Sequence, residues 1–327
     1  MNILLMGGAG YIGPVIADRL LSEGCEVTIA DHLIYNNGHS ILNLYKYNNF
    51  KFINISCGEI TEDFLIMRKF DVIVILSGLV GDPITKNYPE LSQVNNEEEI
   101  QFLAEKIHDD YGAKIVFIST CSNYGLQPEG VLADETTELK PLSLYAKSKV
   151  KNESYLINKF ERTNNVVTIL RFATAYGIAP RMRFDLTINQ FCLEMQSGQK
   201  LEIFDADTWR PYCHVQDFAA IVGGIVRQDP AKIKGQIFNA GSNENNYTKR
   251  HVVDNILHYL PDAKVKYKEI GSDARDYRVN FDKLKRLLNF KPEYNVDRGI
   301  SEIVEASRNG VFDLNTTNRN RYGNYIL

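Results

Sequence analysis

The sequence predicts an α/β protein in which a parallel sheet, covered by helices on both faces, is followed by a smaller domain. Short, almost continuously apolar runs alternate with longer stretches in which apolar residues recur at helical spacing. Strands that are apolar on both faces are typical of a parallel sheet between helix layers, and such strands need right-handed crossovers. The expected fold class is therefore a Rossmann-like, doubly wound parallel sheet with a smaller C-terminal α/β domain.

The expected elements follow one another in regular order up to about residue 172. Strands are expected at 2–6, 26–30, 50–55, 71–76, 114–119 and 166–172. The helices between them are expected at 12–24, 61–69, 92–110 and 143–163. Further on, the pattern is less regular, and arginine and aromatic residues gather in loops. We therefore expect one domain over 1–172, which would also receive part of 213–240, and a discontinuous second domain over 173–327.

The composition argues against several classes of protein. The 327 residues carry a net charge of −4 without a basic run, so a nucleic-acid partner is not expected. Five cysteines without a CxxC pair and six scattered histidines predict neither a disulfide framework nor a metal site. No stretch approaches the ~20 apolar residues of a membrane span. We expect a cytoplasmic protein without a metal.

A glycine-rich turn follows the first expected strand. Gly7, Gly10 and Gly13 in "MGGAGYIG" would let the backbone turn tightly, approach a pyrophosphate and pack a helix against the strand. The N-terminus of that helix offers unpaired N–H groups to phosphate oxygens. Asp31 ends the second strand, where a carboxylate can bind an adenosine ribose and would repel a 2′-phosphate. The pattern favours NAD over NADP, and the alternative is a glycine turn that only packs.

Three Tyr-x-x-x-Lys pairs occur, and their context distinguishes them. Tyr47 precedes a turn, so its lysine would not lie one helical turn away. Tyr145 and Tyr155 share an expected helix, roughly 15 Å apart along its axis. Only Tyr145, near the helix start, would lie at the carboxyl edge of the sheet, where ligands bind in this fold class. We therefore choose Tyr145 with Lys149, and the alternative is a pair on a solvated helix face.

The chosen pair is suited to removing a proton from an alcohol. A free phenol has a pKa near 10, which is too high for a good base at neutral pH. A lysine ammonium ~4 Å away, at an effective dielectric constant of ~20, favours the phenolate by roughly 4 kcal/mol before desolvation. We expect this cation to bring the pKa of Tyr145 towards neutrality. Thr120, which ends the preceding strand, can hydrogen-bond the same substrate oxygen.

Together these motifs resemble the extended short-chain dehydrogenase/reductase family, in particular its nucleotide-sugar epimerases and dehydratases. The resemblance spans nearly the whole chain, through "GGAGYIG", "ISTCSNYG", "YAKSK", "LRFATAYG", "WRPYCHVQDFA" and "FNAGS" in the family's order. It implies an N-terminal domain that binds NAD and a C-terminal domain that binds a nucleoside-diphosphate sugar. By this resemblance Tyr145 would be the base, Lys149 would tune it, and Thr120 would orient the substrate hydroxyl.

The resemblance also implies which positions line the two binding sites. Glu59 would reach the adenine unless it is a solvated loop carboxylate, and Asn95 would support the cofactor unless it only caps a helix. The expected cofactor-binding residues are Gly7, Gly10, Tyr11, Ile12, Gly13, Asp31, Glu59, Ile60, Leu76, Ser77, Gly78, Asn95, Tyr145 and Lys149. The expected substrate-binding residues are Val80, Gly81, Cys121, Ser122, Asn123, Thr174, Arg181, Arg183, Arg210 and Arg275.

Departures from the family pattern narrow the reaction. The 4,6-dehydratases carry an Asp-Glu pair after the threonine, where this chain has Cys121 and Ser122, so a dehydratase is disfavoured. Other relatives carry a catalytic cysteine at the position of Ser122, one residue after Cys121. Because one step at a strand end redirects the side chain, we expect Cys121 to be a packed or pocket-lining thiol. Thr174 replaces an asparagine that often contacts the sugar diphosphate in relatives.

Arginines of the second domain are candidates for binding a diphosphate. Arg210 matches a phosphate-binding position of the family, and Arg275 matches one more loosely. Arg181 and Arg183 in "APRMRFDL" would lie over the cleft by analogy. Surface charge is the alternative for each of them, and for Arg278.

The expected reaction is NAD-dependent oxidation of the C4 hydroxyl of a nucleoside-diphosphate sugar, linked to GDP or UDP. A more specific expectation is a GDP-heptose 4-dehydrogenase of bacterial capsule synthesis, with 2-oxoglutarate as a possible hydride acceptor. The alternative is a UDP- or GDP-sugar 4-epimerase. Lesser alternatives are a reductase of an apolar ketone and a non-catalytic NAD-binding sensor. Helices at 92–110 and 143–163 would pair in a homodimer by analogy with the fold.

Overall fold

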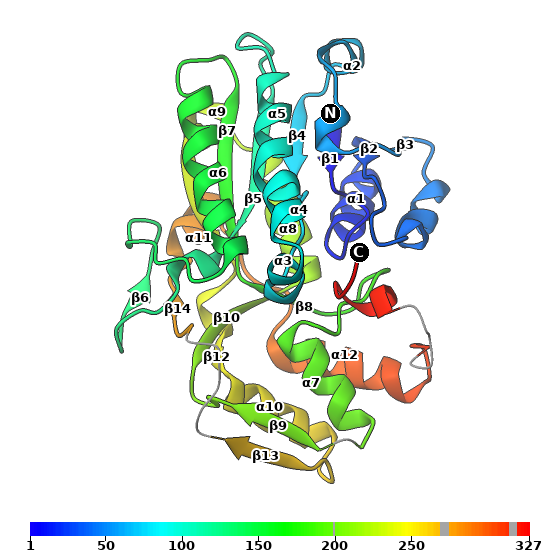
Figure 1. Ribbon diagram of the computed structural model, residues 1–327, viewed down its shortest axis with the longest axis vertical. Coiled ribbons are helices and arrows are strands. Elements are labelled where there is room, and N and C mark those ends of the chain that lie inside the picture. Colours follow the sequence, from blue (N-terminus) through cyan, green and yellow to red (C-terminus); the bar gives the residue numbers. More distant parts are fainter. Residues whose placement is uncertain (199, 269–274, 314–318) are drawn as a thin grey trace.

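The chain folds into two stacked parts, which Figure 1 shows one above the other. The computed structural model describes residues 1–198, 200–268, 275–313 and 319–327. The upper part is a parallel sheet between helix layers, and the lower part consists of shorter strands and helices from the second half of the chain. The C-terminus lies near the junction of the two parts, which places the last residues close to the ends of the central strands.

Seven parallel strands form the central sheet, which has the Rossmann-like arrangement. Their order is β11-β7-β5-β4-β1-β2-β3, so the chain changes direction across the sheet between β1 and β4. Open α/β sheets bind ligands at such a switch point, outside the carboxyl ends of the strands. The strands are β1 (Asn2–Met6), β2 (Glu26–Ala30), β3 (Phe50–Ile53), β4 (Val72–Ile75), β5 (Lys114–Thr120), β7 (Val166–Phe172) and β11 (Gln236–Ala240).

Alternate residues of the strands face two different hydrophobic cores. In β1, Ile3 and Leu5 lie in the core shared with α1 and α8, whereas Leu4 and Met6 lie in the core shared with α2, α5 and α6. A strand covered on both faces requires this alternation of two apolar sets. The helices of the two layers are α1 (Gly13–Ser22), α8 (Val215–Val226), α2 (Glu62–Arg68), α5 (Glu99–Glu105) and α6 (Leu144–Phe160).

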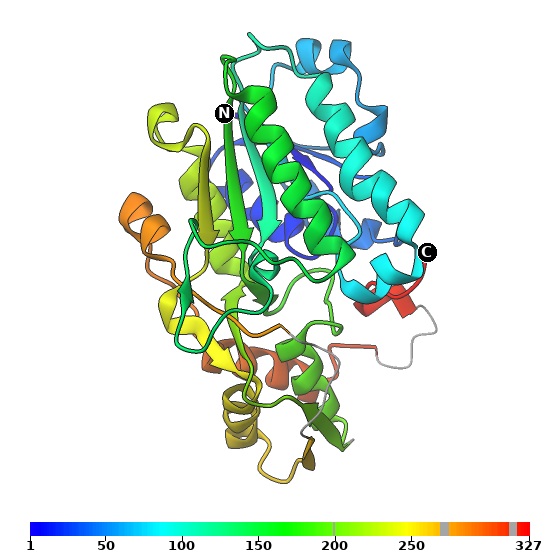
Figure 2. The ribbon, with the colours of Figure 1, turned by 60° about the vertical axis from the view of Figure 1, so that its left-hand side comes forward.

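The smaller part lies below the carboxyl ends of the central strands, which point towards it in Figure 2. It contains a three-stranded sheet in the order β12-β10-β8 and a two-stranded sheet of β13 and β9. The remaining strands are β6 (Leu132–Ala133), β8 (Thr174–Tyr176), β9 (Leu201–Phe204), β10 (Trp209–His214), β12 (Asn246–Thr248), β13 (Val265–Lys268) and β14 (Arg278–Val279). The remaining helices are α3 (Asp82–Asn87), α4 (Pro89–Gln93), α7 (Thr187–Gln196), α9 (Pro230–Ile233), α10 (Lys249–Tyr259), α11 (Asp282–Leu288) and α12 (Val296–Arg308).

The expected strands are all present, and the helix expected at 92–110 is present with different bounds and with a π turn that the sequence did not predict. The chain there forms α4, a π-helical turn (Val94–Glu98) and then α5, which ends at Glu105. The side chain of Asn96 accepts a hydrogen bond from the N–H of Leu79 (2.6 Å) and donates one to its carbonyl oxygen (3.1 Å). A π turn changes which face successive side chains present, and such turns are frequent at functional sites. This one lets Asn96 hold the loop after β4, a long-range contact that sequence periodicity does not reveal.

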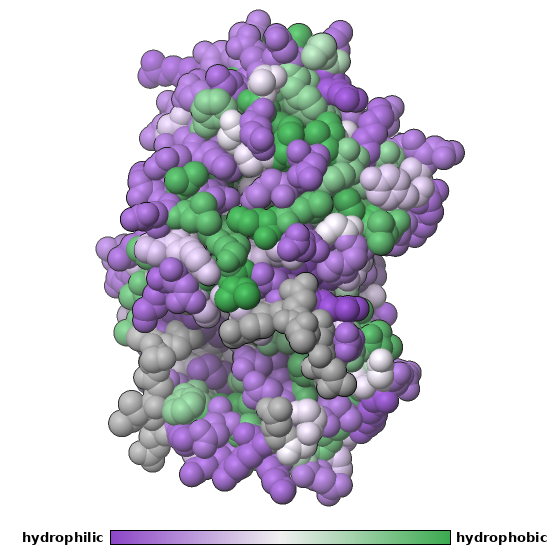
Figure 3. Space-filling model, turned by 45° about the vertical axis from the view of Figure 1, so that its right-hand side comes forward, coloured by the Kyte–Doolittle hydropathy of each residue, from purple (hydrophilic) through white to green (hydrophobic). Residues whose placement is uncertain are grey.

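The surface is largely hydrophilic, with hydrophobic residues in a band across the upper half of the face in Figure 3. Scattered apolar residues of this kind are normal on the surface of folded proteins. None of the described helices is both long and apolar enough to cross a membrane.

A buried ion pair lies beside the carboxyl end of β5. Arg171 of β7 and Glu153 of α6 are each 3% exposed, and the guanidinium binds the carboxylate through Nε (3.1 Å) and Nη2 (2.7 Å). Glu153 also accepts hydrogen bonds from Ser119 and Asn123, and Arg171 donates one to the hydroxyl of Tyr124. Because both charges are fully partnered, removing one of them would leave the other buried and uncompensated.

We expect Glu153→Ala to lower the free energy of unfolding by about 3 kcal/mol or more, because it leaves the buried charge of Arg171 without its carboxylate partner. The matched control is Glu105→Ala, which removes a carboxylate from the exposed contacts with Tyr155 and Lys159. The control substitution should lower the free energy of unfolding by less than about 1 kcal/mol. Urea unfolding monitored by circular dichroism measures both. Equal losses for the two variants would refute the role given to the buried pair.

Candidate active site

One cavity of about 360 Å³ lies at the carboxyl ends of β1, β2, β4 and β5, and both parts of the chain form its wall. It brings together most of the residues expected from the sequence. Those that line it are Gly7, Gly10, Tyr11, Ile12, Gly13, Asp31, Leu76, Ser77, Gly78, Val80, Gly81, Asn95, Thr120, Ser122, Tyr145, Lys149, Thr174, Arg181, Arg183, Arg210 and Arg275. Four expected residues lie outside the lining of this cavity: Glu59, Ile60, Cys121 and Asn123.

The glycine turn is built on close backbone contacts. Gly7 has a φ of 73°, and a Cβ added there would lie 2.6 Å from the Cα of Ser77. A Cβ on Gly13 would overlap the backbone of Gly8, whereas one on Gly10 would have only ordinary contacts. Helix α1 begins at Gly13, with Pro14 in its first turn, so its unpaired N–H groups start at the cavity. The turn can therefore hold a pyrophosphate against a helix N-terminus.

Asp31 is fixed at the end of β2 by two backbone donors. Its Oδ2 accepts a hydrogen bond from the N–H of Ala9 (2.9 Å), and its Oδ1 accepts one from the N–H of Leu33 (2.8 Å). The carboxylate is 9% exposed and lines the cavity. It is thereby placed to accept further hydrogen bonds from a diol such as a ribose.

Glu59 was expected to line the cofactor site, but it lies outside the lining of the cavity. Its carboxylate accepts a hydrogen bond from the N–H of Ser56 (2.7 Å), closing a capping box on the 3-10 turn Cys57–Glu59. Ile60 is 1% exposed and lies in the hydrophobic core. Ser56 and Cys57 line the cavity instead, because the cap turns Glu59 back onto its own loop. The pattern S-x-x-E in "SCGE" was the available signal for this cap.

Tyr145 and Lys149 lie on the first turns of α6, whose N-terminus Ser143 caps by accepting a hydrogen bond from the N–H of Ala146 (3.2 Å). The ammonium of Lys149 lies 5.8 Å from the centre of the Tyr145 ring and donates to the carbonyl oxygen of Ile118 (2.8 Å). Burial lowers the pKa of Lys149 to about 8, so the group still carries its charge at neutral pH. A cation thus lies beside the phenol inside the cavity. Tyr155, by contrast, donates to Glu105 on the outer face of the helix.

Thr120 ends β5 and caps the 3-10 turn Cys121–Tyr124 by accepting a hydrogen bond from the N–H of Ser122 (3.1 Å). Because the Thr120 oxygen acts there as an acceptor, the O–H group can still donate a hydrogen bond to a second partner. Both Thr120 and Ser122 line the cavity. The hydroxyl of Tyr277 donates to Ser122 at 3.4 Å. Two hydroxyl side chains therefore face the same space as the phenol of Tyr145.

Cys121 and Asn123 do not line the cavity, so neither contributes to substrate binding there as expected. For Cys121 this position agrees with the alternative expectation of a packed thiol. Cys121 is 1% exposed, and its thiol donates to the carbonyl oxygen of Arg171 (3.1 Å). Burial raises the pKa of the Cys121 thiol well above its usual value, so it is a poor nucleophile. Asn123 is fully buried and donates to Glu153 (2.8 Å). Both residues support the strand end from behind.

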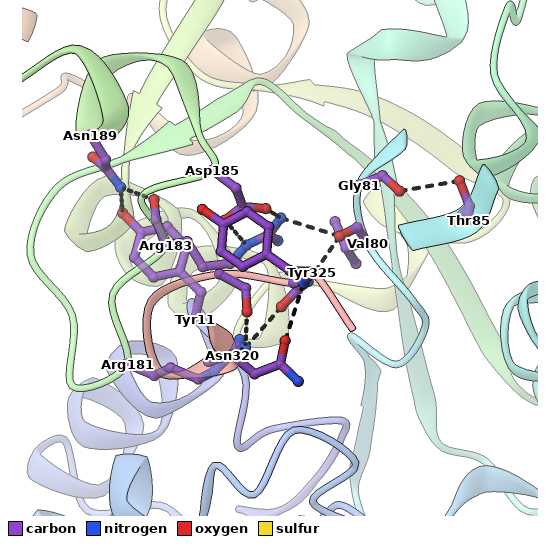
Figure 4. Close-up of polar contacts among 12 residues, drawn as sticks. Tyr11, Val80, Gly81, Thr85, Arg181, Arg183, Asp185, Asn189, Asn320 and Tyr325 are labelled. Carbon is purple, nitrogen blue, oxygen red and sulfur yellow. Dashed lines mark hydrogen bonds and ion pairs between the residues drawn. The ribbon is translucent and has the colours of Figure 1, made fainter. Parts of the chain in front are cut away.

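The two arginines of "APRMRFDL" line the cavity but are bound by protein groups. Arg183 contacts Asp185 through its Nε (2.9 Å) and its Nη2. Burial opposes the charge of Arg183, but the carboxylate of Asp185 outweighs this effect and raises its pKa. Arg181 is 2% exposed, and its Nη2 donates to three oxygen atoms of the C-terminal segment. Figure 4 shows both arginines in this cluster, next to Tyr11 and Val80.

Arg210 and Arg275 form the cationic side of the cavity in the smaller part. The guanidinium of Arg210 lies 5.2 Å from the centre of the Tyr277 ring, and Lys249 also lines the cavity there. Arg278 lies elsewhere, 4.9 Å from the centre of the Trp209 ring. A group of cations at one end of a partly closed cavity is suited to a diphosphate.

Sequence reasoning missed several residues of the cavity wall. Some follow the expected strand ends directly, as do Tyr35 after β2 and Phe172 at the end of β7. Others come from the smaller part and the chain end: Asp185, Lys249, Tyr277 and Asn324. No local motif marks these residues, because only the folding of distant segments against the sheet brings them to the cavity.

Comparison with known proteins identifies the family. The model of the NAD dependent epimerase/dehydratase family matches residues 3–241. The chain is 26% identical to UDP-glucuronate 4-epimerase of Thermodesulfobacterium geofontis, over 94% of this chain and 96% of that protein. The crystal structure of UDP-glucose 4-epimerase from Thermotoga maritima, with UDP-glucose, is 25% identical, with a TM-score of 0.83 over 95% and 100% of the two chains.

A further solved structure shares the fold and the level of identity. The dTDP-glucose 4,6-dehydratase from Bacillus anthracis, in complex with NAD, is 26% identical, with a TM-score of 0.81 over 94% of this chain and 97% of that chain. The family model covers more than two thirds of the sequence, including the glycine turn, the Tyr-Lys pair and the seven strands of the central sheet. The chain therefore belongs to the NAD dependent epimerase/dehydratase family.

Proposed function

We propose that this enzyme is a nucleoside-diphosphate-sugar 4-epimerase that uses NAD and acts on a UDP-sugar. The observation that carries the proposal is that Tyr145, Lys149 and Thr120 line the same cavity as the glycine turn and the cations Arg210 and Arg275. The two 4-epimerases described above add the reaction class. Neither relative is a GDP-heptose 4-dehydrogenase, so that more specific expectation has no support here, and its 4-epimerase alternative fits better.

NAD fits the residues of the upper part. Gly7, Gly10 and the N-terminus of α1 would hold its pyrophosphate, and Asp31 would hold the adenosine ribose and exclude a 2′-phosphate. The close packing of Gly7 against Ser77 requires a glycine and fixes this turn at the edge of the cavity. When bound, NAD supplies the acceptor that takes the hydride from the sugar C4 and later returns it.

The residues of this chain supply the acid–base chemistry. The ammonium of Lys149 favours the phenolate form of Tyr145, which can then take the proton of the C4 hydroxyl. Thr120 can donate a hydrogen bond to the same oxygen and hold it against Tyr145. The 4-keto sugar then rotates so that the opposite face of C4 is towards the coenzyme. After the hydride has returned to that face, the phenol of Tyr145 gives the proton back to the C4 oxygen, and the configuration at C4 is inverted.

The chain offers no carboxylate for water elimination next to Thr120. Cys121 is packed behind the strand, and Ser122 is a hydroxyl whose pKa is too high for general acid–base work at neutral pH. The 4-keto sugar therefore lacks a group that would eliminate water from it, which disfavours a dehydratase. In the proposed epimerase this intermediate is instead reduced on its other face.

The product of the reaction tests the proposal. Purified enzyme incubated with UDP-glucose, UDP-galactose or UDP-glucuronate should give a product of unchanged mass with inverted configuration at C4. The reaction should proceed without net conversion of NAD to NADH. Mass spectrometry and proton NMR of the sugar ring measure this. A product two mass units lighter, formed only when 2-oxoglutarate is added, would show a dehydrogenase and refute the epimerase.

Tyr145→Phe should lower kcat by at least about 100-fold, because the reaction loses its general acid–base group. Tyr155→Phe is the matched control, since Tyr155 shares the helix but contacts Glu105 outside the cavity. The control should keep kcat within about twofold of the unchanged enzyme. Retention of most of the activity by Tyr145→Phe would exclude Tyr145 as the base.

Lys149→Met should move the acidic limb of the pH profile of kcat to higher pH, by about one unit or more. The cation favours the phenolate, so its loss raises the pKa of Tyr145 and the base is active only in more alkaline solution. Lys149→Arg, which keeps the charge, should shift the limb less. An unchanged limb in Lys149→Met would show that Lys149 does not tune Tyr145.

A further inference from the structure

The end of the chain forms part of the cavity wall. Residues 319–327 start with a 3-10 turn (Arg319–Tyr322) and then run back to the upper part of the molecule. Asn324, near the C-terminus, is 5% exposed and lines the same cavity as the glycine turn and Asp31. We refer to residues 319–327 as the C-terminal segment.

Arg181 anchors the C-terminal segment on one side. Its Nη2 donates to the carbonyl oxygens of Asn320 (3.1 Å) and Gly323 (2.9 Å) and to the side-chain oxygen of Asn324 (2.9 Å). The guanidinium lies 4.8 Å from the centre of the Tyr35 ring, which follows β2 and also lines the cavity. Burial lowers the pKa of Arg181 to about 10, so it remains charged at neutral pH. The segment therefore provides the oxygen partners that a buried cation needs.

The loop after β4 anchors the C-terminal segment on the other side. The side-chain amide of Asn324 donates to the carbonyl oxygen of Val80 (2.8 Å), which also accepts a hydrogen bond from Arg183 (3.2 Å). The N–H of Leu327 donates to the hydroxyl of Tyr88 (3.3 Å). In Figure 4 the segment residues Asn320 and Tyr325 lie between Arg181 and Val80. The side chain of Asn324 therefore contacts both Arg181, which packs on Tyr35 after β2, and Val80 after β4.

A third contact ties the C-terminal segment to the smaller part. The N–H of Phe184 donates to the carbonyl oxygen of Tyr322 (2.7 Å), and the two rings pack edge to face with centres 5.5 Å apart. Phe184 lies between Arg183 and Asp185, so the segment also supports the ion pair at the cavity. The segment thus joins the two sides of the cofactor-binding end and the adjoining loop of the smaller part.

We propose that the C-terminal segment is a strap that retains the coenzyme, with Asn324 as the residue that closes it. The proposal rests on the proposed function, because an epimerase must keep its reduced coenzyme until the hydride has returned to the sugar. A dinucleotide bound at the turn of Gly7 and the carboxylate of Asp31 would leave through this cavity, whose wall also includes Tyr35, Val80 and Asn324. We infer that its departure would require the sides at Tyr35 and Val80 to separate. The hydrogen bonds of Arg181 and Asn324 hold those sides together.

The test measures release of the coenzyme alone. Enzyme loaded with NADH is mixed with excess NAD, and the fluorescence of NADH reports its dissociation rate. Deletion of residues 323–327 should speed dissociation at least 10-fold, and Asn324→Ala should speed it about threefold to tenfold. Ile326→Ala is the matched control, because its side chain is 43% exposed while its backbone contact with Asn320 is kept. The control should release NADH at the rate of the unchanged enzyme.

Several outcomes would overturn the strap. An unchanged dissociation rate in the deletion variant would do so, and equal acceleration by Asn324→Ala and Ile326→Ala would do so as well. If the deletion variant does not fold, the comparison of the two point variants decides alone. No sugar is needed in this experiment, so slow release without epimerase activity would refute only the proposed sugar chemistry. Rapid release from the unchanged enzyme would refute the strap.

Discussion

The site depends on the buried ammonium group of Lys149. It is 1% exposed, and taking a charged amine out of water is costly unless partners replace the lost hydration. The carbonyl oxygen of Ile118 accepts its hydrogen bond, and the rings of Phe117 and Tyr145 lie 4.5 and 5.8 Å away. Helix α6 and strand β5 must therefore keep one relative position for the charge to be tolerated. That position places Tyr145 and Thr120 in the same cavity.

The polar cluster behind this strand end keeps the same position from the other side. Glu153 lies one turn of α6 beyond Lys149 and binds Arg171 on the neighbouring strand β7. Its remaining acceptor sites bind Ser119 and Asn123, the residues on either side of the strand end. Burying such a network is favourable only when every member is partnered. The requirement fixes the backbone around Thr120, while Glu153 and Arg171 themselves stay outside the lining of the cavity.

Much of this arrangement could be predicted from the sequence, because it is local. Apolar runs predicted six strands, all of which are present. The glycine turn and Asp31 directly follow strands, and Tyr145 and Lys149 lie at the start of a helix, so all of them meet at one edge of the sheet. The failures have physical causes as well. Glu59 caps its own turn, Asn123 binds Glu153 behind the strand end, and Asn96 of the π turn at 94–98 binds Leu79. Competition between local and distant hydrogen-bond partners decided each of these cases.

The arginines show why charge alone is a weak guide to a ligand. Four of them were candidates for a diphosphate, and all four line the cavity. Arg183 is neutralised by Asp185, and Arg181 is coordinated by the C-terminal segment, so both stabilise the walls. Arg210 and Arg275 line the same cavity from the smaller part of the molecule, and the guanidinium of Arg210 lies over the ring of Tyr277. Of the four arginines, these two therefore remain the candidates for binding the diphosphate of the proposed substrate. The proposed strap across these walls would favour a complete reaction cycle on one retained coenzyme, and such retention would separate the proposed epimerase from a dehydrogenase.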